Sequence, residues 1–166
     1  MTQARRLGRF GVWRSASLAT PELAVSIERL GFGALWLGSP PEHTRQARAV
    51  LGPGPLLAPE HKVVLDTDPG RARALGRTRV QRPYLGLVNY TSNLRRLGWG
   101  DADVSGGGSD ALIDALVAHG SPAEIAAQLT RHLDAGADHV CLQLITEEGA
   151  DPLPGYRALA PALGLS

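Results

Sequence analysis

Two short segments with the same design, one near each end of the chain, constrain the fold most. Leu133–Leu144 reads as the end of a helix, then a glycine at position 136, then a buried strand. Glu28–Gly38 has the same order, with Gly31 as the glycine. A helix that opens with Ser-Pro or Thr-Pro precedes each strand, and such repeated helix–strand units build either a doubly wound sheet or a (β/α)8 barrel. We therefore predict an α/β fold with parallel strands.

The amino-terminal part of the chain predicts two strands and two helices. Thr20 can cap the first helix, Pro21 suits its first turn, and Gly31 can end it. The proline pair in Ser39-Pro-Pro41 then breaks the second strand. The patterns predict, in order, a strand over 7–13, a helix over 20–31, a strand over 34–37 and a helix from 43 or 44 to 50 or 51.

The rest of the chain predicts two further strands among helices. Ser121-Pro-Ala-Glu124 is a capping box with proline at the first helical position, and Asp68 can cap an earlier helix. The predicted elements are a strand over 61–65, a helix over 69–76, a helix over 79–97 interrupted near Pro83, a polar loop over 98–108, a helix from 109 or 110 through Val117, a helix over 121–136, a strand over 139–145 and a short final helix.

Composition limits the classes of partner. The formal net charge is +1, so there is no electrostatic reason to expect nucleic acid or an anionic membrane as a partner. No apolar run is long enough to span a bilayer or to form a signal peptide, which makes a cytoplasmic protein the default expectation. Cys141 is the single cysteine, and its place in the last strand favours a buried, inert thiol. The arginine, alanine, glycine and proline content is typical of proteins from GC-rich bacteria.

Several segments, in this order, resemble one protein family. They are Phe10–Trp13, Leu30–Gly38, Ala58–Leu65, Tyr84–Gly98 and Ala135–Val140. Together they are similar to the luciferase-like flavin or deazaflavin oxidoreductases (LLM class), and to the actinobacterial branch that uses coenzyme F420. The resemblance covers nearly the whole chain, although no single motif in it is diagnostic.

This resemblance implies a (β/α)8 barrel, a fold that typically takes about 250 residues. The chain has 166 residues, and the family's strands from about the third to the sixth have no counterpart in it. We therefore interpret residues 1–166 as one shortened domain with an internal deletion near 39–41. The expected fold is a partial TIM-barrel-like α/β fold of about four parallel strands with flanking helices.

The resemblance also implies a reaction and candidate site residues. The reaction is hydride transfer between coenzyme F420 and an unknown small organic substrate, with FMN and a monooxygenase reaction as the alternative. Gly38 and Ser39 follow the second predicted strand, where family members line the cofactor pocket, and the helix that begins at His43 and Thr44 has exposed amides for an anion such as a cofactor phosphate. The substrate-pocket candidates are Trp13, Asn89 and Tyr90. The structural alternatives are a turn at Gly38 and Ser39, a helix cap at Thr44 with a solvated His43, and helix packing of Asn89 and Tyr90.

Other candidate chemistry is weak, and no catalytic residue is predicted. Glu60 and His61 are adjacent on a strand, so their side chains point to opposite faces and structural roles are favoured. His139 and Cys141 share a face, but two ligands do not make a zinc site, so no metal is predicted. The chain carries no P-loop, nucleophile elbow or zincin motif.

Two hypotheses about function follow. The first is a luciferase-like oxidoreductase acting on a small molecule. The second is a catalytically silent remnant of the same family that associates through exposed sheet edges, as a possible homo-oligomer.

Overall fold

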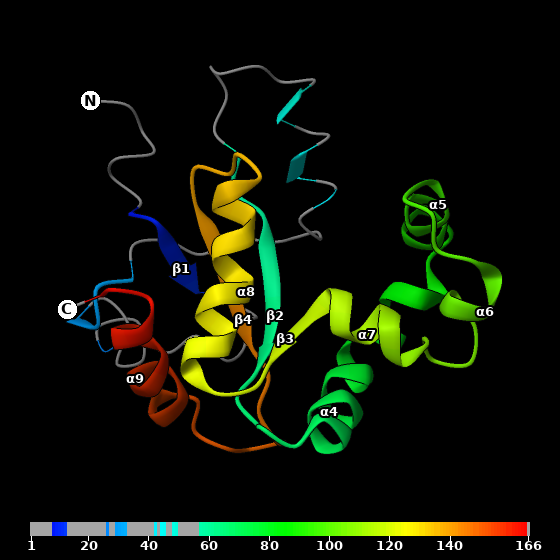
Figure 1. The fold of residues 1–166 in the computed structure, drawn as a ribbon. Coiled ribbons are helices and arrows are strands. Elements are labelled where there is room, and N and C mark those ends of the chain that lie inside the picture. Colours follow the sequence, from blue (N-terminus) through cyan, green and yellow to red (C-terminus); the bar gives the residue numbers. More distant parts are fainter. Residues whose placement is uncertain are drawn as a thin grey trace.

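A computed structural model describes residues 8–12, 26, 29–32, 42, 44–45, 48–49 and 57–165. The predicted strand over 34–37, most of the helix over 20–31 and the break at 39–41 lie outside these residues. The described elements, in chain order, are β1 (Phe10–Val12), β2 (Glu60–Val64), α4 (Pro69–Gln81), η2 (Tyr84–Gly86), α5 (Val88–Arg96), α6 (Asp101–Val104), α7 (Asp110–Leu116), β3 (Val117–His119), α8 (Pro122–Asp134), β4 (Val140–Leu144) and α9 (Leu153–Ala162) (Figure 1).

The described strands form one open parallel sheet. It has four strands in the order β1-β4-β2-β3, and each neighbouring pair is parallel. Phe10 pairs with Val140 and Val12 with Leu142, so the last strand lies beside the first. These observations confirm the predicted α/β fold with about four parallel strands and flanking helices.

Helices cover both faces of this sheet. On one face, α8 and α9 pack over a core cluster that includes Val63, Leu129 and Leu142. On the other face, α4 and α7 pack over Val64 and Val117. Because neighbouring strand residues point to opposite sides, Val63 and Val64 belong to different faces. We call the two sides of the sheet the α8 face and the α4 face.

Several helices begin and end at the capping residues and glycines that the sequence predicts. Asp68 caps α4 by accepting a hydrogen bond from the Arg71 amide. The glycines of the two repeated units, Gly31 and Gly136, have φ angles of 85° and 99°. That left-handed conformation is open to glycine at little cost and ends a helix by turning the chain away. The glycine stop predicted for both units is therefore confirmed.

The capping box at the start of α8 allows a direct test of how much one capping side chain stabilises the protein. The Ser121 hydroxyl accepts from the Glu124 amide, and the Glu124 carboxylate accepts from the Ser121 amide at 2.8 Å. We expect Ser121→Ala to lower the free energy of unfolding by about 1 kcal/mol, because one helix-end amide loses its partner. Urea denaturation followed by circular dichroism measures this. Ser92→Ala on the exposed side of α5 serves as the control, and an equal loss in both variants would contradict the expectation.

Three predicted boundaries were wrong. Val117 belongs to strand β3 and not to the preceding helix, because it pairs with Lys62 of β2 in the parallel sheet. The loop over 98–108 contains the short helix α6. Helix α4 does not end at Gly76 but continues to Gln81. Gly76 allows α4 to pack closely on β3, because a Cβ at this position would lie 3.0 Å from a Val117 methyl group.

The described part of the chain contains no helix long and apolar enough to cross a membrane.

Candidate functional site

The predicted site residues do not come together in the described structure. Trp13, Gly38, Ser39 and His43 lie outside the described residues. Thr44 is buried and its hydroxyl lies 3.0 Å from Nδ1 of His132, on α8. Tyr90 lines a pocket on the α4 face, and its neighbour Asn89 is exposed on α5. Thr44 and Tyr90 therefore belong to different sides of the sheet.

The pocket on the α4 face is a half-open cavity of about 80 Å³. Strand β2 forms its base, and the segment from α4 to α5 folds back over it, with α7 closing one side. Its polar lining comes from β2, η2 and α5, and its apolar lining from α4, η2, α5 and α7. The lining residues are Glu60, His61, Lys62, Val80, Tyr84, Leu85, Tyr90, Asn93, Leu94 and Leu116.

A buried ion pair lies at the base of the pocket. The Lys62 ammonium is 3.3 Å from the Glu60 carboxylate, and the two side chains are 11% and 2% exposed. They lie two residues apart on β2, so the pleat of the strand places both on the same face. Lys62 is the only lysine in the chain. A charged group that is removed from water requires a group of opposite charge nearby, and here Glu60 and Lys62 provide this for each other.

Two tyrosines form the wall above this pair. The Lys62 ammonium lies 4.3 Å from the centre of the Tyr84 ring, in a cation–π contact. The Tyr84 and Tyr90 rings meet edge to face, with centroids 4.7 Å apart. Burial, and then the negative charge of Glu60, raise the pKa of the Tyr84 hydroxyl. Tyr84 therefore stays neutral at physiological pH and can donate or accept a hydrogen bond.

The pocket lies over the middle of the sheet and not at its carboxyl edge. Lys62 is the third residue of β2 and pairs with Val117 and Gln143 on the neighbouring strands. In (β/α)8 barrels the sites lie at the carboxyl ends of the strands. Here η2 and α5, which follow α4 in the chain, line the pocket together with β2, so the pocket lies against the strand itself.

Sequence reasoning missed Lys62 and Tyr84 as site residues. The sequence favours structural roles for Glu60 and His61 and points to neither Lys62 nor Tyr84. One signal was available: the only lysine of the chain lies two residues after a glutamate, at the start of a segment with strand character. A buried lysine is uncommon, and it points to a paired or functional charge.

Buried histidines form a second polar cluster on the α8 face. His61 Nδ1 lies 2.9 Å from His132 Nε2, and His132 Nδ1 lies 3.0 Å from the Thr44 hydroxyl. Burial is the main reason that the pKa of His61 is lowered well below its usual value and that of His132 falls to about 4. Both rings are therefore neutral at pH 7, and each can donate from one nitrogen and accept at the other. The cluster joins β2, α8 and the Thr44 segment.

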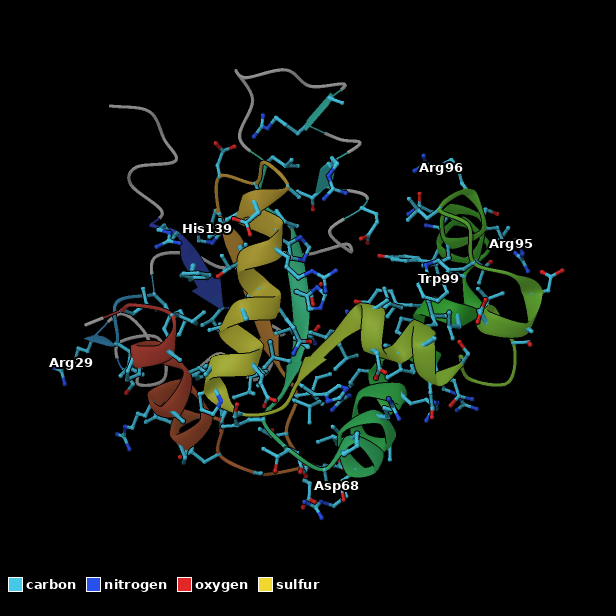
Figure 2. All side chains as sticks on the ribbon, viewed as in Figure 1. Arg29, Asp68, Arg95, Arg96, Trp99 and His139 are labelled. Carbon is cyan, nitrogen blue, oxygen red and sulfur yellow. The ribbon has the colours of Figure 1, made fainter. Side chains whose placement is uncertain are left out.

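In the part of the chain that the structure describes, the buried atoms His139 Nε2 and Gln143 Oε1 have no hydrogen-bond partner. His139 Nδ1 lies 2.9 Å from the Gly8 carbonyl beside β1, and its Nε2 is unpaired (Figure 2). The Oε1 atom of Gln143 is also unpaired. Gln143 on β4 pairs with Lys62 on β2, so both side chains lie on the α4 face of the sheet. Among the residues that the structure describes, no three His, Cys, Asp or Glu side chains converge as a metal site would require.

Comparisons with known proteins give little further information. No family model matches the chain, and no curated protein matches it. Among solved structures, the chain is similar to the crystal structure of apo-MsnO8, with a TM-score of 0.47 and 20% sequence identity. That similarity covers 95% of this chain and 68% of the MsnO8 chain.

Proposed function

We propose that this chain is a shortened luciferase-like oxidoreductase that binds a small organic substrate in the pocket beneath Tyr84 and Tyr90. The reaction that the family resemblance implies is hydride transfer between coenzyme F420 and that substrate. One observation carries the proposal. The segment Tyr84–Gly98, which resembles the family's insertion near the substrate entrance, supplies half of the residues that line a pocket with a buried ion pair at its base.

The pocket beneath Tyr84 and Tyr90 is too small to enclose a deazaflavin ring. An enclosed cavity of about 150 Å³ holds a single benzene ring. At about 80 Å³ the pocket is smaller than that, and a deazaflavin has three fused rings. Of the residues proposed for cofactor binding, Gly38, Ser39 and His43 lie outside the described part, and Thr44 is hydrogen-bonded to His132.

This size favours a second candidate function, a catalytically silent relative that retains a small-molecule pocket. The open sheet also supports it, because β1 and β3 are the terminal strands of the described sheet and unpaired strand edges invite association. In this case the chain binds neither coenzyme, and its oligomeric state depends on protein concentration.

Titration of the full chain with each coenzyme separates the candidates. We expect coenzyme F420 to bind at micromolar concentration, with a change in its absorbance spectrum, and FMN to bind at least about tenfold more weakly. The reverse preference would favour the flavin monooxygenase alternative. If neither coenzyme binds to monomer or oligomer, the oxidoreductase proposal fails and the silent relative stands.

A further inference from the structure

We infer that the pocket beneath Tyr84 selects a small, uncharged carbonyl compound, held by a hydrogen bond from Lys62 to its carbonyl oxygen. The inference rests on the proposed function only where it names this compound as the substrate. The binding itself requires no coenzyme. Three properties of the pocket lead to this class of ligand: its volume, its charge and its unused hydrogen-bond donors.

Volume and shape set the size of the ligand. The half-open cavity of about 80 Å³ has about half the volume that encloses a benzene ring, so the ligand is at most one small ring, part of which extends through the open side. The apolar part of its lining comes from Val80, Leu85, Leu94 and Leu116, and the tyrosine rings line one wall. Apolar lining with a few polar groups is typical of sites for mainly hydrocarbon ligands. A five-membered ring or a short branched chain fits these limits.

Charge excludes an ionic ligand. Glu60 and Lys62 are both buried and neutralise each other at a separation of 3.3 Å. Arg95 and Arg96, at the end of α5, are exposed and do not line the pocket (Figure 2). A charged group at the buried base of the pocket would lose its hydration without gaining an unpaired counter-charge, which is unfavourable. The ligand is therefore neutral.

The pocket has unused hydrogen-bond donors in addition to the Tyr84 hydroxyl, which can donate or accept. The Lys62 ammonium has three N–H groups, and within the described residues its hydrogen-bond partner is Glu60. The Asn93 carbonyl already accepts from Arg96 at 2.7 Å, which leaves its amide nitrogen as a donor. A ligand with an acceptor oxygen satisfies these donors, whereas a pure hydrocarbon leaves them buried and unpaired. A carbonyl compound combines this acceptor with a small apolar body.

The single lysine makes the test direct. In protein labelled with ¹³C and ¹⁵N at lysine, the only side-chain signal comes from Lys62. We expect cyclopentanone to shift this signal saturably in the absence of any coenzyme. Methylenecyclopentane, which has the same shape without the oxygen, and cyclopentylammonium, which carries a charge, are expected to bind at least about tenfold more weakly. Equal or tighter binding of either analogue would overturn the inference, as would the absence of any saturable shift.

Variants locate the interaction, with ligand-observed saturation-transfer NMR as the readout. The double variant Glu60→Gln with Lys62→Met removes both charges and should abolish the preference for cyclopentanone over methylenecyclopentane. Ser92→Ala, on the exposed side of α5, should keep that preference. A preference that survives the double variant would place the binding elsewhere and refute the role of Lys62. Because these measurements contain no coenzyme, their failure is distinct from a failure to bind F420.

Discussion

We expect Lys62→Met to lower the free energy of unfolding by about 3 to 5 kcal/mol, the largest loss predicted for a single side chain in this protein. The substitution keeps an unbranched apolar stem but removes the ammonium that lies 3.3 Å from Glu60. The Glu60 side chain is only 2% exposed, so water cannot replace the lost charge. The cation–π contact with Tyr84 disappears as well. Urea denaturation at pH 7.5, followed by circular dichroism, measures the change.

The matched control removes both charges together. Glu60→Gln combined with Lys62→Met leaves no buried ion, and we expect it to lie within about 1 kcal/mol of the natural chain, because desolvation offsets most of a buried pair's attraction. If the double variant loses as much stability as Lys62→Met alone, lost packing and not the loss of the ion pair explains the effect. A single variant as stable as the natural chain would show that Glu60 and Lys62 are not a buried pair.

The second large effect is a loss of stability in mild acid, caused by the histidines of the α8 face. His132 has a pKa of about 4 in the folded chain, mainly because it is buried, against an ordinary value of 6.5. The unfolded chain therefore binds protons first, so stability is full above about pH 7.5 and falls as the pH drops from 6.5 toward 4. His132 alone accounts for a loss of about 2.5 kcal/mol by pH 4.5. The lowered pKa values of His61 and His139 act in the same direction.

The pH window separates these histidines from the carboxylates. A hydrogen bond from Arg73 is the main cause of the lowered pKa of Asp114. Hydrogen bonds from Ser121 are the main cause of the lowered pKa of Glu124. Both carboxylates therefore resist protonation in the folded chain. Their stabilising effects are present above the unfolded pKa values and begin to disappear only below about pH 4.5. His132→Asn should reduce the difference in stability between pH 7.5 and pH 4.5 by about 2.5 kcal/mol, although its stability at pH 7.5 is lower. A natural chain equally stable at pH 7.5 and pH 5 would rule out the neutral histidine pair.

Local patterns in the sequence determined the elements that carry their own start and stop signals. Ser121 and Glu124 begin α8, Gly136 ends the turn after it, and β4 follows as predicted. Pro83 interrupts the helical segment between α4 and α5, also as predicted. These signals act within a few residues, through backbone hydrogen bonds and allowed φ angles, so they are readable without the rest of the fold. The parallel arrangement followed because a helix separates successive strands.

Tertiary structure decided the elements and contacts whose causes lie far apart in the chain. The run before Gly120 is apolar enough for either a helix or a strand, and pairing with β2 converts Val117–His119 into a strand. The His61–His132 contact joins residues 71 positions apart. The pocket exists because η2 and α5 fold back over Glu60 and Lys62, so that a strand residue meets the Tyr84 ring. The periodicity of apolar residues shows which face of a helix or strand is buried. Long-range packing determines which other helix or strand contacts that face, and therefore which side chains line the pocket.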